Sequence, residues 1–163
     1  MSAAVIRPAA RGDVPAVHGL VRELAIYEKL EHLCTGTVQA LDEALFGEPR
    51  RVDVLVADLD GEIVGFALFF PTFSTFLARP GIWLEDLYVK PAHRGAGIGR
   101  RLLGSLAALA VERGCGRFEW AVLDWNAPAI AFYERMGATV LPDWRLVRVT
   151  GEPLDRLAAS AAD

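Results

Sequence analysis

A carboxylate set in a run of strand-forming residues is the first group in this chain that could do chemistry. Alternation along the run from Trp83 to Val89 places Glu85 on one face with Trp83 and Leu87, and Asp86 on the other face with Leu84. A carboxyl among large apolar side chains should have a raised pKa and accept a proton readily. A glutamate paired for structural reasons, or a charge at a strand edge, is an equally good interpretation of the residues alone.

A glycine-rich bend follows this strand and opens an amphipathic helix. Pro91 ends the strand pairing, and glycines at 95, 97 and 99 leave backbone N–H groups uncovered where the helix starts. Because a helix dipole favours an anion at that end, the bend predicts a phosphate site. A turn whose glycines serve only tight packing is the simpler alternative.

Two common phosphate-binding patterns do not fit the bend. The dinucleotide fingerprint G-x-G-x-x-G would need glycine at Arg100 or at Leu102. A P-loop beginning at Gly99 would have neither its lysine nor its hydroxyl residue. The bend itself reads Arg94-Gly-Ala-Gly-Ile-Gly99, and no nucleotide-binding pattern of these two kinds describes it.

Basic side chains gather around the bend although the formal net charge of the chain is −4. Two of them fall in the first helical turn, where they oppose the helix dipole. A bound polyanion would explain the cluster, and a solvated basic rim is the alternative. The five residues are Lys90, His93, Arg94, Arg100 and Arg101.

Composition limits the class of protein. The 163 residues are 53% hydrophobic and 23% charged, which predicts one globular domain over residues 1–163. The absence of a membrane-length apolar span and of a signal-peptide pattern predicts a cytoplasmic protein that does not enter membranes. The two cysteines and three histidines lack metal-ligand spacing, so no metal is expected. The acidic balance argues against nucleic acid and suits a cationic acceptor.

Hydrophobic periodicity predicts an α/β chain in the order β-α-α-β-β-β-α-β-α-β, a mixed sheet with helices on both faces. A hairpin turn is expected at 58–61, and a parallel crossover is expected around the helix that follows the bend. The predicted strands are Val5–Arg7, Val52–Ala57, Ile63–Phe70, a run ending at Val89, Arg117–Leu123 and Trp144–Val149. The predicted helices run from the cap Asp13 to about Leu30, from the cap Thr37 through Phe46, from Ile98 to Gly114 and from the cap Asn126 through Met136, with a short one after Pro153.

The bend Arg94–Gly99 resembles the R/Q-x-x-G-x-G/A pyrophosphate loop of the GNAT N-acetyltransferases, whose ligand is acetyl-coenzyme A (acetyl-CoA). The order of elements is also similar to that fold, a mixed, mostly antiparallel sheet of six to seven strands flanked by helices on both faces. Other segments resemble the diamine (spermidine/spermine) N-acetyltransferase branch, including its thialysine-acetylating relatives. They are Arg22–Glu28, Leu84–Val89, Leu123–Asn126, Phe132-Tyr133, Gly137-Ala138 and Trp144-Arg145.

The resemblance implies roles for two proton-transfer groups and for a cofactor site. Glu85 would deprotonate the acceptor amine and Tyr133 would protonate the departing thiolate, although an aromatic at helical spacing is more often a core residue. Asn126 would bind the cofactor arm, or serve only as a helix cap. The implied acetyl-CoA residues are Leu87, Tyr88, Val89, Arg94, Gly95, Ala96, Gly97, Ile98, Gly99, Arg100, Asn126 and Tyr133.

The same resemblance implies an acceptor site for a small cationic amine and, by analogy, a homodimer. Carboxylates with aromatic walls suit ammonium groups. The segment Phe73–Phe76 departs from the strict polyamine enzymes and is closer to the thialysine type, so a polyamine, a diamine or a lysine-like amino acid all stay open. The implied acceptor residues are Tyr27, Glu28, Glu85, Asp86 and Trp144.

Two other classes of function fit parts of the sequence. A non-catalytic acyl-CoA-binding module would keep the bend and lose the proton-transfer groups. A protein or peptide N-acetyltransferase would need an open groove in place of an acidic acceptor site.

Overall fold

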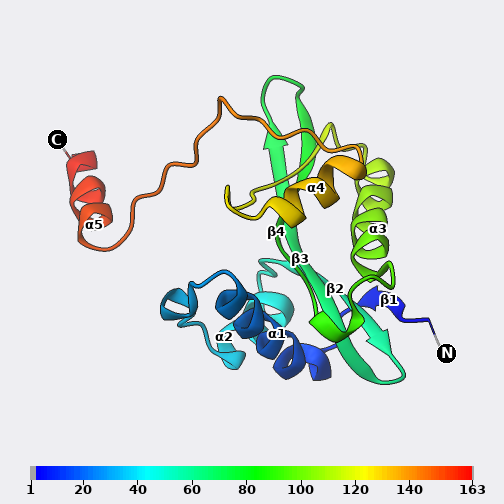
Figure 1. Cartoon of the computed structure of the whole chain (residues 1–163). Helices are drawn as coiled ribbons and strands as arrows, with labels where there is room; N and C mark the ends of the chain where they lie inside the picture. The colour runs from blue at the N-terminus through cyan, green and yellow to red at the C-terminus, as the bar shows by residue number, and fades with distance from the viewer. Residues whose placement is uncertain (1–2, 163) are drawn as a thin grey trace. The chain divides into compact units, whose positions relative to one another are not determined.

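The computed structural model describes residues 3–162 and forms two compact units (Figure 1). Within these residues, the N-terminal unit ends at Ala121 and the C-terminal unit begins at Val122. The N-terminal unit contains the sheet, the glycine-rich bend and most of the predicted site residues. Each unit is described by itself.

The sheet has the strand order β1-β2-β3-β4-β5 within residues 3–162. The first four strands pair antiparallel, whereas β5 runs parallel to β4. The chain passes from β4 to β5 through helix α3, which is the predicted parallel crossover. The strands are β1 Val5–Pro8, β2 Asp53–Leu59, β3 Glu62–Ser74, β4 Arg79–Val89 and β5 Arg117–Trp120.

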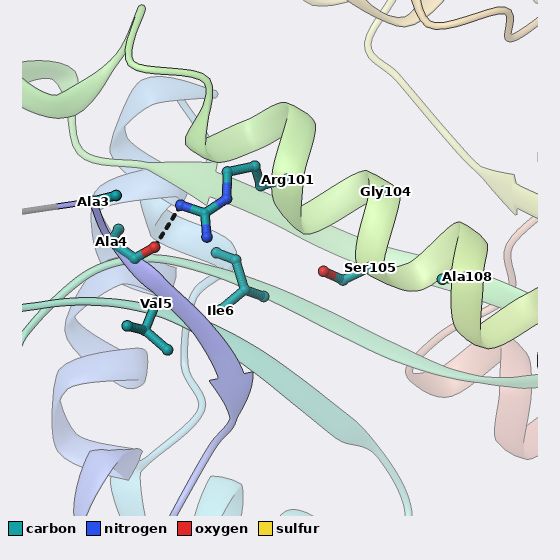
Figure 2. A pocket seen from close by; sticks show the side chains of 8 residues that line it. All are labelled: Ala3, Ala4, Val5, Ile6, Arg101, Gly104, Ser105 and Ala108. Atoms are coloured by element: carbon teal, nitrogen blue, oxygen red, sulfur yellow. Dashed lines mark hydrogen bonds between the residues drawn. The ribbon is translucent and has the colours of Figure 1, made fainter.

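Helices cover both faces of this sheet, as the sequence predicts. Helices α1 (Val14–Tyr27) and α2 (Val38–Phe46) pack on one face, and α3 (Ile98–Glu112) lies on the other, with the sheet between them in Figure 2. Short 3₁₀ turns join the elements at Arg11–Asp13, Glu31–Leu33 and Pro91–His93.

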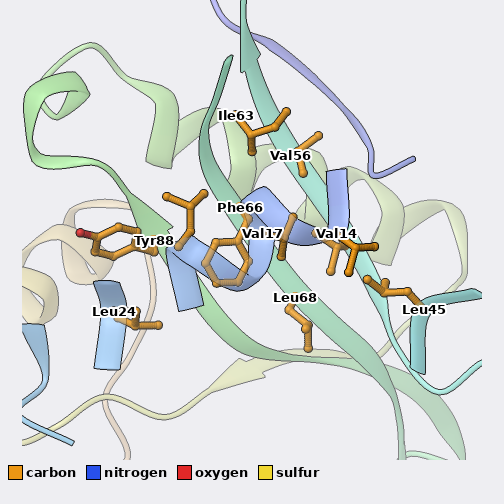
Figure 3. Packing of buried hydrophobic residues seen from close by; sticks show 11 residues of the cluster. Val14, Val17, Leu24, Leu45, Val56, Ile63, Phe66, Leu68 and Tyr88 are labelled. Atoms are coloured by element: carbon orange, nitrogen blue, oxygen red, sulfur yellow. The ribbon is translucent and has the colours of Figure 1, made fainter. Parts of the chain in front are cut away.

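Figure 3 shows the core between α1, α2 and the sheet. Phe66 at its centre is fully buried, and Val17 and Leu20 of α1 are 0% and 1% exposed. Each such side chain contributes about 1.5–3 kcal/mol by leaving water. This packing fixes the end of α1 against β4. The members are Val14, Val17, Leu20, Leu24, Leu45, Val54, Val56, Ile63, Phe66, Leu68 and Tyr88.

Local signals predict three of the element boundaries in this unit correctly, although at the third, the start of α1 after Asp13, the expected side-chain cap is absent. The Thr37 side chain accepts a hydrogen bond from the Ala40 N–H (3.1 Å), as expected of a helix cap. The hairpin turn holds Asp60 at φ 52° and Gly61 at φ 92°, the backbone of a two-residue turn with left-handed residues. Asp13 makes no side-chain cap for α1, because its carboxylate accepts hydrogen bonds from Arg7 Nη1 and from the Ala10 N–H, both at 2.7 Å.

The C-terminal unit contains two α-helices, α4 (Ala127–Arg135) and α5 (Glu152–Ala159), and a final turn at Ser160–Ala162, in the part of the chain that the structure describes. The Asn126 side chain accepts from the Ala129 N–H at 3.4 Å, which confirms the predicted cap of α4. The predicted strand Trp144–Val149 is wrong: this segment pairs with no strand of residues 3–162. The sheet therefore has five strands among those residues, fewer than the expected six to seven.

Two further findings apply only to residues 3–162. None of their helices has the length and apolar character needed to span a bilayer. No three of their histidine, cysteine, aspartate or glutamate side chains come together as a metal site.

Candidate active site

Strand β4 loses its pairing partners at Glu85. Asp86 pairs with Leu68 of β3 and Leu84 pairs with Phe69, so Glu85 has no opposite residue on β3 and forms a β-bulge. On the other side of β4, the pairing with β5 extends only as far as Leu84. Glu85 is thus paired neither with a residue of β3 nor with a residue of β5.

The bulge changes which side chains share a face. Opposed residues of antiparallel strands lie on the same face, and consecutive residues lie on opposite faces. Because Leu68 and Phe69 are consecutive, their partners Asp86 and Leu84 lie on opposite faces of the sheet. The prediction that Leu84 and Asp86 share a face is therefore wrong, and Asp86 lies on the face that α1 covers.

Glu85 is exposed at this site. The expected enclosure of its carboxylate by apolar side chains is not found, because the extra residue of the bulge lies outside the regular alternation. Its carboxylate has one neighbour of well-defined geometry, the indole of Trp83, whose Nε1–H donates to Oε2 at 2.8 Å.

Asp86, in contrast, is the carboxyl with a strongly perturbed pKa. Burial, together with the charges of Glu85 and Glu28, raises the pKa of Asp86 from 3.8 to about 6. Burial also raises the pKa of Glu28, which lies just past the end of α1. Glu85 and Glu28 thus lie close enough to Asp86 for their charges to act on it, and Asp86 and Glu28 are both partly buried.

Beyond the bulge, β4 has one unpaired edge. Tyr88 and Val89 pair with Phe66 and Gly65 of β3, while β5 offers no partner to residues 85–89. A Cβ on Gly65 would meet the Tyr88 carbonyl oxygen at 2.9 Å, so glycine permits this close pairing. An open strand edge can hydrogen-bond an extended ligand that carries amide groups.

The glycine-rich bend has the backbone geometry that the sequence predicts. Gly95 and Gly97 have φ values of 82° and 77°, in the left-handed region that favours glycine. Nothing lies within 4 Å of a Cβ placed on either one, so conformation rather than crowding requires glycine. Helix α3 begins directly at Ile98 with Gly97 as its cap residue, and its first N–H groups have no helical partners.

Arg94 is held by the protein itself. Its Nε donates to the Val89 carbonyl at 2.9 Å, and its guanidinium carbon lies 5.2 Å and 5.3 Å from the ring centres of Tyr27 and Tyr88. Tyr88 in turn donates through its hydroxyl to Glu23 of α1 at 3.2 Å. This cluster fastens the end of α1 to the strand and to the bend.

Two more of the five basic residues also have protein partners. Lys90 pairs with Glu62 at 2.7 Å. Arg101 donates to the Ala4 carbonyl at one end of a shallow groove between β1 and α3 (Figure 2). That groove contains none of the predicted site residues. The basic cluster is therefore explained in part without a polyanion, and the amides of the bend, with Arg100 and His93, carry the phosphate prediction.

The other predicted site residues lie in the C-terminal unit. Tyr133 is on α4, with its ring 5.5 Å from that of Phe132. Asn126 is 7% exposed at the start of α4, and Trp144 is 79% exposed in the segment between α4 and α5. Their roles toward acetyl-CoA and the amine stay predictions.

Sequence reasoning did not name Trp83 or Glu23 as site residues. A signal for Trp83 was present, because residues two apart on a strand share a face and Trp83 precedes Glu85 by two. For Glu23 no local signal exists, since its contact with Tyr88 depends on how α1 packs against β4.

An unpaired strand edge beside a glycine-capped helix start can hold an extended ligand with amide groups and an anionic end, as an acyl-CoA-dependent transferase requires. The family model described as the acetyltransferase (GNAT) family matches residues 22–138, and the chain belongs to that family. It is thus an N-acetyltransferase of the kind that uses acetyl-CoA as co-substrate.

Individual relatives cover nearly the whole chain. A thialysine N-epsilon-acetyltransferase from Sus scrofa is 38% identical over 97% of this chain and 99% of its own. The L-ornithine N5-acetyltransferase NATA1 from Arabidopsis thaliana is 34% identical, over 93% of this chain and 86% of its own. An integron cassette protein of V. cholerae has a similar solved structure, with a TM-score of 0.81, 26% identity and coverage of 97% and 99%.

Proposed function

We propose that this protein transfers the acetyl group of acetyl-CoA to a primary amine of a small cationic acceptor, by direct attack within a ternary complex. The acceptor would be a polyamine, a diamine or a lysine-like or thialysine-like amino acid. The observation that carries the proposal is the juxtaposition of two carboxylates of β4, and Glu28 at the end of α1, with an unpaired strand edge and a glycine-rich helix start. One end of this strand suits a cation and the other suits a diphosphate.

The residues present fit acetyl-CoA. The free edge at Leu87–Val89 would hydrogen-bond the amide-bearing pantetheine arm and polarise the thioester carbonyl. The left-handed glycines would expose the N–H groups of the bend to the diphosphate. The implied diphosphate residues are Arg94, Gly95, Ala96, Gly97, Ile98, Gly99 and Arg100, with Asn126 and Tyr133 at the arm. Arg94 would act mainly by shaping the bend, because its guanidinium already contacts two tyrosines.

Two side chains would account for the two proton transfers of the reaction. An alkylammonium of pKa about 10.4 costs roughly 4–5 kcal/mol to deprotonate at pH 7. Glu85 would take that proton, directly or through water, and the freed nitrogen would attack the carbonyl carbon of the thioester. When the carbon–sulfur bond breaks, Tyr133 would protonate the departing thiolate, leaving an N-acetyl amine and coenzyme A.

The acidic cluster supports a cationic acceptor. An ammonium group beside Asp86 and Glu28 would lower the pKa values that burial has raised, so that binding the cation and ionising the carboxyls favour each other. Tyr27 would add an aromatic wall. The names of the two relatives, for thialysine and L-ornithine, favour an amino acid with a side-chain amine over a long polyamine.

The experiment is release of free thiol from acetyl-CoA in the presence of a panel of amines. Thialysine, L-ornithine, L-lysine, spermidine and a short diamine would be compared with lysine-containing peptides in competition. We expect a small amine to be acetylated fastest. Preference for peptides would overturn the acceptor class, and no thiol release with any acceptor would leave a non-catalytic acyl-CoA-binding module.

A homodimer forms a separate part of the proposal. Large apolar side chains between α4 and α5 are exposed in the isolated chain, with Leu146 at 71% and Val147 at 90%. A second copy would cover such a segment, which has the composition of a strand. The native mass in solution tests this, and a monomer at micromolar concentration would contradict it.

We also propose that residues 1–163 act as one catalytic domain in the cytoplasm, with neither nucleic acid nor membrane as partner. Cys34 and Cys115 are both free thiols, which suits a reducing compartment. Fluorescence microscopy of a tagged protein tests the location.

A further inference from the structure

Trp83 of β4 is paired with a neighbouring strand on each side. It pairs with Phe70 of β3 and with Glu119 of β5, and its side chain is partly buried. A residue with two strand neighbours has a fixed backbone, and a half-buried indole has few accessible rotamers. Trp83 is therefore a rigid group only two residues from the bulge.

Glu85 has none of these restraints. It lacks an opposite residue on β3, lies beyond the last pair with β5 and is exposed. Fixing a free glutamate side chain costs up to about 1.5–2 kcal/mol of rotamer entropy. The indole N–H of Trp83, 2.8 Å from Oε2, is the contact with defined geometry that can hold its carboxylate.

We propose that Trp83 is the positioning residue for Glu85, an inference that rests on the proposed function. An indole nitrogen donates one hydrogen bond and accepts none. It can hold the Oε2 atom and leave Oε1 to accept the proton of the amine. It cannot itself replace the base.

The indole N–H of Trp83 is an uncharged hydrogen-bond donor, which suits this acidic site. Asp86 lies close enough to Glu85 that their negative charges interact, and Glu28 in turn lies close to Asp86. A lysine or arginine at position 83 could also hold the carboxylate, but its positive charge would repel the cationic acceptor and make Glu85 a weaker base. A neutral N–H donor orients the carboxylate without either effect.

The kinetic test is a double-mutant cycle between Trp83→Phe and Glu85→Gln. Phenylalanine keeps an aromatic ring and removes the N–H. We expect kcat to fall about tenfold in Trp83→Phe with an unchanged KM for acetyl-CoA, and no further fall when the change is made in the Glu85→Gln background. Trp120→Phe, on the neighbouring strand and paired with Leu84, is the matched control, in which kcat should change less than twofold.

Each kinetic outcome decides the question. Unchanged kcat in Trp83→Phe, or equal losses in both backgrounds, would show that Trp83 does not act through Glu85. Loss of folding in Trp83→Phe would appear as a fall in melting temperature that Trp120→Phe does not share. In that case the contact is judged by the spectroscopic measurement, in which Trp83 stays intact.

That measurement follows the indole N–H resonances of the four tryptophans by nuclear magnetic resonance, assigned by elimination with Trp→Phe changes at 120, 125 and 144. The Trp83 resonance should shift most on Glu85→Gln and should lie downfield of a solvent-exposed indole. A Trp83 signal that does not respond would overturn the inference even if the enzyme is active. Absence of thiol release by the wild-type protein would instead overturn the proposed function and leave this readout valid.

Discussion

The two halves of β4 differ in how the sheet holds them. From Gly81 to Leu84 the strand has partners on both sides, and Ile82 and Leu84 are 0% and 2% exposed. Glu85 then forms a bulge with no partner, and from Asp86 to Val89 the strand has partners on β3 alone. A single continuous strand thus serves as core in its first half and presents unpaired backbone and ionisable side chains in its second half.

Because of this difference, residues that stabilise the fold and residues available to a ligand lie only a few positions apart on one strand. Backbone groups that are paired on both sides cannot bind a ligand, whereas an edge can. A residue at a bulge can turn its side chain away from the packed face. Changes in the first half should therefore act on folding, and changes in the second half should act on substrates.

The largest effect is expected for Glu85→Gln. Removing the proposed general base should lower kcat about 100-fold or more, with little change in melting temperature because the side chain is exposed. Steady-state kinetics with a saturating amine measure this. Glu112→Gln, an exposed change at the end of α3, is the control, and a Glu85→Gln enzyme with wild-type turnover would remove Glu85 from its role.

Gly81→Ala should have the opposite effect to Glu85→Gln, lowering stability and leaving turnover unchanged. A Cβ at this position would lie 2.6 Å from Thr72 Oγ1 and 3.2 Å from the Arg117 carbonyl oxygen, inside the doubly paired half. We expect the free energy of unfolding to fall by about 2 kcal/mol. Chemical denaturation measures it, while kcat per folded molecule should stay the same.

The matched change for Gly81→Ala is Thr72→Ala. It removes the closer of the two obstructing atoms, so the double variant should recover part of the lost stability. Equal stability of Gly81→Ala and the wild type would mean that the strands can separate freely here, and would contradict the comparison.

A smaller effect is expected for Gly97→Ala. The space around the position is open, so alanine costs only the strain of the left-handed backbone, about 1 kcal/mol. If the bend relaxes to another conformation, the same free energy raises the Kd of acetyl-CoA about five- to tenfold. Calorimetric titration with acetyl-CoA measures it. Gly104→Ala, in the interior of α3 with equally open space, should leave the Kd unchanged, and equal Kd values in both variants would remove the bend from the cofactor site.

The smallest effect concerns Asp86→Asn. The pKa of Asp86 is about 6 in the folded protein and 3.8 as the ordinary value, chiefly through burial, so the folded state holds this proton more tightly. Ionisation of Asp86 therefore lowers stability as the pH rises from about 4 to about 6. Asparagine should raise the free energy of unfolding at pH 7.5 by about 1 kcal/mol, allowing for solvent screening of a partly exposed group.

Thermal unfolding of both proteins between pH 4 and pH 7.5 measures that difference. The two melting temperatures should converge at the acidic end, where Asp86 is protonated in the wild type. An Asp86→Asn protein that is less stable than the wild type at pH 7.5 would show that the charge is compensated by a partner.

Short-range signals made part of the fold predictable. Thr37 caps a helix through a hydrogen bond three residues away, and Gly97 adopts the left-handed conformation that the bend demands. The apolar spacing of α3 depends only on helical periodicity. In each case the deciding interaction lies within one turn of the residue concerned.

Long-range registers were not predictable in this way. Strand alternation assumes that every residue of β4 has a partner, and nothing local reveals that Glu85 is skipped by β3. Likewise, the β-rich composition of 144–149 indicates a strand but does not supply its partner. The mistaken environment of Glu85 and the missing strand have the same cause.

The sequence by itself determined the chemical groups: a glutamate in a strand, the glycines of a bend that opens a helix and a likeness to the GNAT family that the comparisons confirm. The tertiary structure alone decided that Asp86 is partly buried while Glu85 is exposed, and that an indole donates a hydrogen bond to the Glu85 carboxylate. The physical reason is that helix caps and left-handed turns are local interactions. A bulge, a strand edge and the burial of a charge depend on residues far apart in the chain.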